Sequence, residues 1–566
     1  MMLSAAVVSS LLARTRKYGF GLTGWRHNLA AVMLGLASVL AMAPFFIWPI
    51  LFVTLPCLIW LIDGRLLAPA AKDITKPGAR WHRLEQRPAM QAALTAWLFG
   101  FGYHLAGLFW IGEAFLVEAE KFAFLMPLAV TLMPAGLALF WGAAAAAVTP
   151  FWQPGIARVL ALAIALAISE WLRGHILSGF PWNIIGYALT YPLALMQSAS
   201  LIGIYGLTLL ALIVLPLPLV LLAETDSATT PAQALARATL PLLPLVLLAA
   251  VGQLRIDADE PAPDQNMTIR IVQPSVPQRE KWRPENQEKI FRQHLDMSRS
   301  NPRGTEDGAR GVKLILWPEA AMPFLPLHSP VALAAIGRML PEGTHLASGA
   351  LRMVEKADGK GRDVFNSLLV FGHGGSLTAS YDKIHLVPFG EYLPLQSTLE
   401  AIGLEQLSRL RGGFASGPRP RPLLTIPGLP KLAPLICYEA IFPATIVQGA
   451  ERPAALINVT NDGWFGNTTG PRQHLHQARL RAVEEGLPVL RAANNGISAI
   501  VDAKGRVLAS AGMNEIATID GLIPAALTPP LYARIGDWAF ALLLALATAA
   551  FGWLRQRGAN GKRTSP

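Results

Sequence analysis

The sequence predicts a polytopic α-helical membrane domain of about eight spans, joined to a separate α/β domain. Of its 566 residues, 52% are hydrophobic and only 15% are charged, with a mean hydropathy of +0.39. This composition is too apolar for an ordinary soluble protein. Apolar runs long enough to cross a bilayer recur through residues 1–256, whereas residues 267–522 alternate short β-branched runs with segments of helical spacing. The two patterns indicate two domains with different surroundings.

The net charge of +11 does not indicate a nucleic-acid partner. No basic stripe with interleaved aromatic residues is present, and the lysines and arginines gather at the edges of apolar runs. Cations at these edges are typical of membrane proteins, because they set the orientation of the spans. We therefore expect a lipid bilayer, and no nucleic acid, as a partner.

Seven candidate spans precede the α/β domain and one follows it. The apolar stretch 29–62 is too long for one span and contains Pro44 and Pro49, so we divide it near residues 43–49 into two helices. We assign a membrane domain to 1–256, a catalytic-type α/β domain to 267–522 and a C-terminal transmembrane helix to 535–556. The other candidate spans are 92–111, 124–147, 156–172, 195–222, 234–251 and 538–554.

The orientation follows from the lysine and arginine residues. Basic residues cluster in the N-terminal segment, in the loop 63–87 and in the tail after Arg555. With seven spans before the α/β domain, all three clusters lie on one side, which should be the cytoplasmic side. The N-terminal basic residues follow a weak apolar stretch rather than precede it, so we reject a secretory signal peptide. The α/β domain is then expected outside the cytoplasm.

The α/β domain is predicted from nine short apolar runs and four segments of helical composition. Residues 502–505 form a hairpin turn between two strands. The predicted strands are 268–272, 313–317, 345–350, 367–371, 377–381, 432–436, 454–458, 488–492 and 497–501. The predicted helices are 285–299, 329–340, 441–449 and 473–486.

Three predicted strands end in reactive side chains. Cys437 follows one buried strand, Glu319 follows a second after a proline, and Lys383 follows a third with Glu391 eight residues later. In an open α/β sheet, a site lies where such strand ends converge. A carboxylate that removes a thiol proton, a thiolate that attacks a carbonyl and an ammonium that stabilises the oxyanion are the parts of acyl transfer through a thioester. Taken singly, each residue also fits a structural role, as a buried small residue, a helix cap or a surface charge.

These residues lie in segments that resemble the three motifs of the nitrilase (carbon–nitrogen hydrolase) superfamily. The segments are Trp317-Pro318-Glu319, the run from Tyr381 to Glu391, and Ile436-Cys437-Tyr438-Glu439. The resemblance implies an αββα sandwich fold for residues 267–522 and a Glu-Lys-Cys triad. With seven spans before this domain and one after it, the whole chain is similar to the apolipoprotein N-acyltransferase family of that superfamily.

The resemblance assigns a role to each matching residue. Cys437 would be the nucleophile, Glu319 the general base and Lys383 the residue that stabilises the oxyanion. Glu391 matches the second acid of the family, and Asn366 matches a structural element of the site. Two further pairs match residues beside the nucleophile and a mobile loop over the pocket: Tyr438 with Glu439, and Trp464 with Phe465. The other reading of the aromatic pair is two buried rings under a glycine turn.

The family resemblance implies a reaction between two membrane lipids. An acyl chain would move from a phospholipid such as phosphatidylethanolamine, through a cysteine thioester, to the α-amino group of S-diacylglyceryl-cysteine in a diacylated apolipoprotein. The expected location is the bacterial inner membrane, with the catalytic domain on the periplasmic side. We expect no cofactor and no metal, because the two cysteines, Cys57 and Cys437, show no metal-ligand spacing.

Two alternatives remain open from the sequence. A membrane-anchored amidase of the nitrilase type would share the triad and hydrolyse a C–N bond, but one anchor would suffice for it. The second alternative is a non-catalytic lipid-binding scaffold or a transporter. A transporter would have ionisable residues within its spans, and the candidates are His104, Glu113 and Glu170. An acyl group on Cys437 in native membranes would distinguish the transferase from the scaffold.

Overall fold

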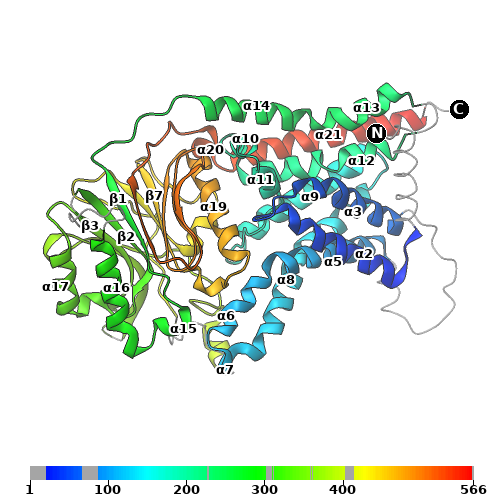
Figure 1. Cartoon of the computed structure of the whole chain (residues 1–566). Coiled ribbons are helices and arrows are strands. Elements are labelled where there is room, and N and C mark those ends of the chain that lie inside the picture. Colours follow the sequence, from blue (N-terminus) through cyan, green and yellow to red (C-terminus); the bar gives the residue numbers. More distant parts are fainter. Residues whose placement is uncertain are drawn as a thin grey trace. The chain divides into compact units, whose positions relative to one another are not determined.

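The protein is described here by a computed structural model, in which the chain divides into two compact units (Figure 1). Unit 1 comprises residues 1–109, 127–257 and 535–566, and unit 2 comprises 110–126 and 258–534. The structure describes residues 21–66, 87–225, 229–300, 309, 311–356, 359, 361–401 and 413–563.

Unit 1 is built of helices whose boundaries follow proline and capping signals. Pro88 starts one helix at a position where its missing N–H costs nothing, and Thr230 forms a capping box with Gln233. The helices are α2 (Gly24–Ser38), α3 (Leu51–Leu66), α5 (Pro88–Leu108), α8 (Met126–Val148), α9 (Ile156–His175), α10 (Leu193–Met196), α11 (Ala199–Val214), α12 (Leu217–Leu222), α13 (Pro231–Thr239), α14 (Leu243–Asp257) and α21 (Trp538–Arg563).

Within the described residues, six helical segments are long and apolar enough to cross a membrane. Two of the eight expected spans fall outside this set. The helix α2 has only 15 residues, and α9 carries Arg158, Glu170 and Arg173. The total of eight spans therefore stays a prediction, and most of the basic loop used to orient them lies outside the described residues. The six segments are Trp48–Leu66, Pro88–Leu116, Ala119–Phe151, Ala199–Leu222, Pro231–Asp257 and Trp538–Arg557.

Several buried ionisable groups of unit 1 form ion pairs with one another. Arg158 lies 3.3 Å from Asp63 and 2.7 Å from Glu224. Glu170 pairs with Arg173 one turn along α9 and accepts a 2.6 Å hydrogen bond from the indole N–H of Trp141. A charge in an apolar interior is tolerated when it is paired in this way.

The described residues of unit 2 form two β-sheets. The first has the strand order β11-β1-β2-β3-β4-β5, with β1, β2 and β3 parallel and the other pairs antiparallel. Its strands are β1 (Thr268–Gln273), β2 (Val312–Met322), β3 (His345–Glu355), β4 (Arg362–Phe371), β5 (Leu377–Asp382) and β11 (Ala517–Leu522).

The second sheet has the order β10-β9-β8-β7-β6. Strands β6, β7 and β8 run parallel, and β8, β9 and β10 follow as antiparallel neighbours. The strands are β6 (Leu432–Ile436), β7 (Ala455–Thr460), β8 (Val489–Ala493), β9 (Ser498–Val501) and β10 (Val507–Ala511).

Side chains alternate between the two faces of each sheet, so that the two sheets pack face to face and helices cover their outer faces in four layers. Leu314 and Leu316 of β2 join a core that also contains residues of the second sheet, whereas Ile315 and Trp317 point to the opposite face, as a period of two requires. The helices α16 (Gln287–Arg299) and α17 (Pro330–Met339) cover that outer face, and α19 (Gly470–Glu485) covers the outer face of the second sheet (Figure 1). The predicted αββα sandwich is confirmed.

Two expectations for individual elements were wrong or incomplete. Residues 441–449, expected to be helical, form turns and bends after a short 3₁₀ helix, because Pro443 disfavours a helical conformation before it and Ala444 has φ +57°. The edge strand β11 was not predicted, since its sequence contains Asp520 and Gly521, which are uncommon in strands. Asp520 is held there by a 2.7 Å ion pair with Arg270 of β1.

Candidate active site

Cys437 stands at the end of the buried strand β6, where the chain turns into the 3₁₀ helix η11 (Cys437–Ile441). Its φ of +50° lies in the left-handed region, which a residue with a Cβ adopts only when the surrounding structure holds it there. Its side chain is buried, with 6% of its surface exposed. A strained turn between a strand and a helix is a way to present a nucleophile on a rigid base.

Glu319 lies within β2 rather than beyond its end. The strand continues to Met322, but its pairing with β3 is irregular between Trp317 and Met322, and Ala320 has φ +48°. The resulting bulge brings the β2 backbone close to Gly349 of β3, where a Cβ would lie 2.4 Å from the Cα of Glu319. A bulge of this kind re-aims a side chain that a regular strand would point elsewhere.

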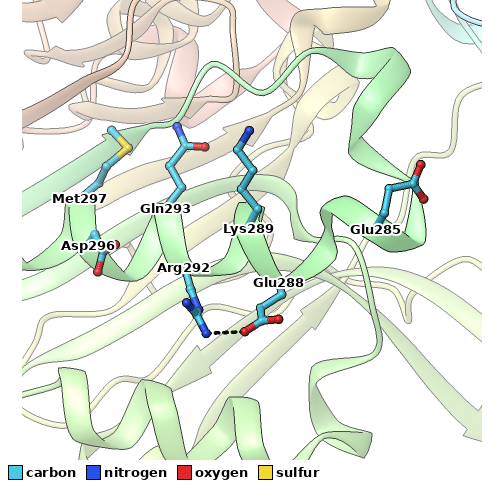
Figure 2. Close-up of a pocket in the computed structure, with 7 residues that line it drawn as sticks. All are labelled: Glu285, Glu288, Lys289, Arg292, Gln293, Asp296 and Met297. Carbon is cyan, nitrogen blue, oxygen red and sulfur yellow. Dashed lines mark hydrogen bonds and ion pairs between the residues drawn. The ribbon is translucent and has the colours of Figure 1, made fainter.

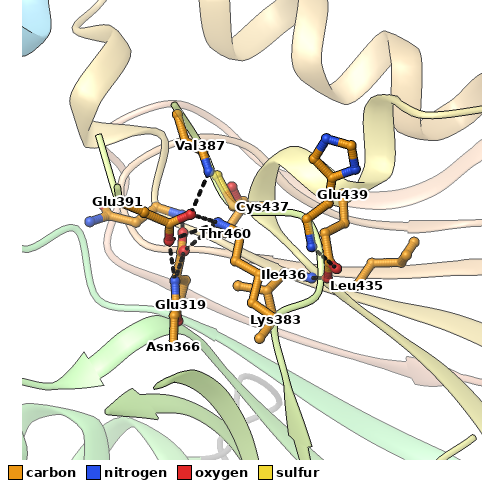
Figure 3. Close-up of polar contacts among 12 residues, drawn as sticks. Glu319, Asn366, Lys383, Val387, Glu391, Leu435, Ile436, Cys437, Glu439 and Thr460 are labelled. Atoms are coloured by element: carbon orange, nitrogen blue, oxygen red, sulfur yellow. Dashed lines mark hydrogen bonds and ion pairs between the residues drawn. The ribbon is translucent and has the colours of Figure 1, made fainter. Parts of the chain in front are cut away.

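Lys383 directly follows β5 and is completely buried between two carboxylates (Figure 3). Its Nζ lies 3.0 Å from Glu391 and 3.6 Å from Oε1 of Glu319. Glu391 is held in turn by a 2.8 Å hydrogen bond from the backbone N–H of Val387. The structure therefore brings the predicted Lys and both predicted acids together.

Two asparagines position the Glu319 carboxylate. The side-chain amide of Asn366, on β4, donates 2.8 Å hydrogen bonds to both Glu319 and Glu391. The backbone N–H of Asn461, after β7, donates to the other oxygen of Glu319 at 2.9 Å. Asn366, which was expected at the site from the sequence, thus bridges the two acids, whereas Asn461 was not among the predicted residues.

The electrostatics of the cluster favour a neutral thiol beside a charged ammonium. Burial, followed by the nearby Glu319 carboxylate, raises the pKa of the Cys437 thiol well above its usual range, and Lys383 only partly opposes this. Burial alone would lower the pKa of Lys383, but Glu391 and Glu319 outweigh it and raise that pKa. A thiol in this environment needs a base to accept its proton as it reacts.

Glu439 braces the two strand ends that carry Lys383 and Cys437. Its carboxylate accepts hydrogen bonds from the backbone N–H groups of Ile384 at 3.0 Å and Ile436 at 2.8 Å, which adjoin those two residues. Burial alone would raise the pKa of Glu439, but Arg421, 3.2 Å away, lowers it. Tyr438 is also buried, and its ring packs against Phe442 with centroids 5.0 Å apart. Both residues support the turn at the cysteine.

Trp464 and Phe465 lie in the 3₁₀ helix η12 (Asp462–Phe465) and are neither fully buried nor fully exposed. The Phe465 ring meets Trp110 edge-on, with centroids 4.5 Å apart. Gly466 ends the loop with φ +61° and ψ −170°, a conformation essentially restricted to glycine. The loop is anchored on one side by aromatic packing and turns sharply on the other.

Sequence reasoning missed two buried groups near the site. Lys281 of α15 (Gln278–Lys281) donates a 3.0 Å hydrogen bond to the backbone carbonyl of Glu319, and burial lowers its pKa to about 8. Behind the cysteine, His474 of α19 contacts both Asp462 and the backbone carbonyl of Cys437. The sequence carried one signal, since charged and polar residues in helices that cover a sheet are unusual where those helices face the core.

A separate shallow groove runs along α16, lined by seven side chains (Figure 2). Its charges are mixed and exposed, and one pair, Arg292 with Glu288, lies at 2.5 Å. Exposed pairs of this kind contribute little to binding or stability. The groove shares no residue with the cluster around Cys437 and is lined by Glu285, Glu288, Lys289, Arg292, Gln293, Asp296 and Met297.

Comparison with known families gives two matches in this chain. The family described as Carbon-nitrogen hydrolase matches residues 268–530, and the family described as Apolipoprotein N-acyltransferase N-terminal domain matches residues 34–216.

Curated relatives match over nearly the full length. Proteins named apolipoprotein N-acyltransferase from Rhodopseudomonas palustris and Bradyrhizobium diazoefficiens are each 44% identical over 527 residues, covering 92% and 93% of this chain and 94% of each relative. One of the same name from Brucella suis is 40% identical over 536 residues, covering 94% of this chain and 95% of the relative.

Among solved structures, an amidase from Nesterenkonia sp. AN1 is 19% identical, with a TM-score of 0.33, and covers 50% of this chain and 98% of its own. A carbon-nitrogen hydrolase from Helicobacter pylori is 17% identical, with a TM-score of 0.31, and covers 45% of this chain and 88% of its own.

Proposed function

The chain belongs to the apolipoprotein N-acyltransferase family, and we propose that it transfers the acyl chain through a thioester on Cys437, assisted by Glu319 and Lys383. The protein is a membrane protein, and its reaction is the N-acylation of lipoproteins. The roles of the three residues, the identity of the lipid donor and the side of the membrane are the proposed parts.

One observation carries the assignment of the residues. A buried lysine lies 3.6 Å from one carboxylate and 3.0 Å from another, beside a buried cysteine in a left-handed turn. Paired buried charges can be purely structural, but a nearby thiol whose pKa they perturb favours chemistry. The carboxylate, ammonium and thiol are the general base, electrophile and nucleophile that acyl transfer requires.

The first half-reaction loads the enzyme. The Cys437 thiol passes its proton to Glu319 as the sulfur attacks the ester carbonyl of a phospholipid, and a C–S bond forms. The oxyanion develops beside the Lys383 ammonium, which stabilises it. Collapse of this intermediate breaks the ester C–O bond, and the leaving alkoxide takes the proton from Glu319. The products are a lysophospholipid and an acyl thioester.

The second half-reaction unloads the enzyme onto an amine. The neutral α-amino group of the lipoprotein cysteine attacks the thioester carbonyl, and Glu319 accepts its proton. The C–S bond then breaks, the thiolate is reprotonated, and an amide remains. A free α-amino group has a pKa of about 7.7–8.0, so a substantial neutral fraction exists near neutral pH.

We propose a phosphatidylethanolamine-like phospholipid as donor, and a periplasmic location of unit 2 at the bacterial inner membrane. A soluble enzyme would have to draw a long acyl chain into water, at about 0.8 kcal/mol for each CH₂. Helices of membrane-spanning length in the same chain let the tail stay in hydrocarbon. The two alternatives are weaker: Glu170 is engaged in an ion pair and a hydrogen bond, as a structural charge would be, and an amidase needs one anchor.

The function is tested on lipoproteins isolated from cells with and without this protein. Mass spectrometry of their N-terminal peptides should show three acyl chains when the wild-type protein is present and two when it is absent or carries Cys437→Ala. The Cys57→Ala variant is the matched control, since Cys57 lies in helix α3 of unit 1, and it should restore triacylation. Triacylated lipoproteins in cells that contain only the Cys437→Ala variant would contradict the proposal.

A further inference from the structure

The turn that carries Cys437 is contacted from behind by a fully buried histidine. His474 lies on the first turns of α19, and its Nε2 is 3.1 Å from the backbone carbonyl oxygen of Cys437. A carbonyl oxygen can only accept a hydrogen bond, so Nε2 must carry the proton and donate it. The contact joins a helix of the outer layer directly to the backbone of the proposed nucleophile.

The orientation of the imidazole is fixed by a second set of buried contacts. Nδ1 of His474 lies 2.9 Å from Oδ1 of Asp462 and 3.2 Å from the guanidinium of Arg491. Arg491 also donates a 2.7 Å hydrogen bond to the other oxygen of Asp462. Thr460 donates to Oδ1 of Asp462 at 2.9 Å. Burial would raise the pKa of Asp462, but Arg491 and His474 lower it to about 2, so it stays ionised. The histidine therefore cannot rotate without breaking buried polar contacts.

We propose that His474 is a positioning residue, whose Nε2–H holds the carbonyl of Cys437 and keeps the nucleophile in its left-handed turn. This inference rests on the proposed role of Cys437. The φ of +50° is unfavourable for a cysteine, and rotation of the peptide unit out of that conformation would swing the sulfur away from Glu319 and Lys383. A displacement of about 1 Å at a reacting atom costs about 100-fold in rate.

His474 also touches the loop that carries Trp464 and Phe465. Its ring meets that of Phe465 edge-on, with centroids 5.9 Å apart, and Asp462 is the first residue of η12. One imidazole thus contacts both the backbone of the nucleophile and the base of the aromatic loop. The positions of these two parts of the site are coupled through it.

Two substitutions at His474 separate its two contacts. In His474→Gln the amide nitrogen reaches the position of Nε2 and still donates to the Cys437 carbonyl. In His474→Asn the shorter amide reaches only the position of Nδ1, so it keeps the contact with Asp462 and loses the one with Cys437. The matched control is His476→Asn, because His476 is also buried on the same helix. Residues two apart on a helix do not face the same side, so its side chain points away from that of His474.

The experiment uses the full-length protein in detergent micelles with added phosphatidylethanolamine. Three quantities are measured: the rate of acylation of Cys437 by mass spectrometry, its rate of alkylation by iodoacetamide, and the thermal midpoint. We expect His474→Asn to lose about 100-fold in acylation and to alkylate more slowly, and His474→Gln to stay within about tenfold of wild type. His476→Asn should react like the wild type even if its thermal midpoint falls as far as that of His474→Asn.

Equal rates in His474→Asn and wild type would overturn the inference, and so would equal losses in the Asn and Gln variants. A loss in His476→Asn as large as in His474→Asn would do the same, because it would trace the effect to the helix rather than to the carbonyl contact. Alkylation needs no lipid, so it decides the role of His474 even if no acyl-enzyme forms in wild type. If no acyl-enzyme forms in the wild type, the proposed function is overturned, and the role of His474 is still decided by the alkylation rates.

Discussion

At the scale of single residues, Glu319 combines a charge with a tightly specified position. Its two oxygens accept hydrogen bonds from Asn366 and from the backbone of Asn461, and its backbone is displaced by the bulge in β2. A carboxylate held this firmly is ready to accept a proton without rearranging. A substitution that keeps the shape therefore tests the charge together with the hydrogen bonds that the two oxygens accept.

We predict that Glu319→Gln still folds, with a lower thermal midpoint because its NH₂ faces an N–H donor, and that it loses acyl transfer by about 10²- to 10⁴-fold, the usual contribution of a general base. Glutamine preserves the shape and removes the charge. The rate of Cys437 acylation and the thermal midpoint should be measured together. Glu285→Gln, at an exposed acid of unit 2, serves as the control and should match wild type in both. An active Glu319→Gln variant would show that another group accepts the thiol proton.

The lowered pKa of Lys281 predicts how the stability of the folded protein depends on pH. Burial lowers its pKa from 10.5 to about 8, so the unfolded chain binds the proton more tightly than the folded one does. The stability of the wild type should therefore rise as the pH rises from about 8 to about 10.5, and at pH 7 the buried charge costs about 3 kcal/mol. The thermal midpoint of Lys281→Met should exceed that of the wild type by the largest amount at pH 7. This difference should disappear by pH 10.

The control for this measurement is Lys289→Met, which removes an exposed lysine of α16. Its difference from wild type should not change with pH over the same range. A Lys281→Met difference that is also constant between pH 7 and pH 10 would show that Lys281 keeps an ordinary pKa in the folded protein.

At the scale of elements, the loop after β7 depends on one glycine. Gly466 has φ +61° and ψ −170°, and a Cβ there would lie 2.6 Å from the Glu113 carboxylate. Gly466→Ala should therefore displace Trp464 and Phe465 and slow acyl transfer by up to about 100-fold. The measurement is the rate of triacylation of a diacylated lipopeptide.

A matched control tests whether positive φ alone explains the loss. Gly428 has φ +73° in a turn before β6 and open space where a Cβ would be. Gly428→Ala should lower the thermal midpoint and leave the transfer rate unchanged. If both variants transfer at the wild-type rate, the aromatic loop has no part in the reaction.

The elements that the sequence predicted well are those with a strict apolar pattern. Strands β1, β6 and β8 are almost entirely buried, and their apolar runs indicated them within one or two residues. The pattern failed where one residue overrides it, as Pro443 does in the expected helix and as Asp520 does in β11. Pairing across a sheet, which stabilises β11 against β1, leaves no local signal.

The residues of the site also fall into those that the sequence indicated and those that it did not. Glu319, Lys383 and Cys437 could be singled out because each follows a recognisable apolar run in the sequence. Lys281 and His474 were missed, because both contact backbone carbonyls of residues distant in sequence, and a polar residue in a helix does not show which carbonyl it contacts. The bulge that aims Glu319 was also invisible, since only tertiary pairing reveals that β2 continues past it.

At the scale of the whole molecule, the orientation of the catalytic unit is open to direct test. We predict that unit 2 faces away from the cytoplasm, on the basis of the basic segments and an odd number of spans before it. Ser416 is an exposed position of unit 2. A cysteine introduced there, with Cys57 and Cys437 changed to alanine, should react with a membrane-impermeant maleimide once the outer barrier is permeabilised.

The control is a cysteine introduced at Arg26, an exposed position near the start of α2. It belongs to the basic N-terminal region and should react only after the inner membrane is lysed. The reverse pattern, with Ser416→Cys labelled only after lysis, would contradict the orientation.

The central claim is that one thiol serves two lipid substrates in turn, and the most direct measurement is the mass of the Cys437 peptide. Purified enzyme is incubated with phospholipid alone, digested and analysed, and a parallel sample then receives a diacylated lipopeptide. We predict an acyl adduct on Cys437 that persists without acceptor, because water is kept out, and disappears when the amine is added. Steady release of free fatty acid without acceptor, or triacylation with no adduct at Cys437, would contradict the account.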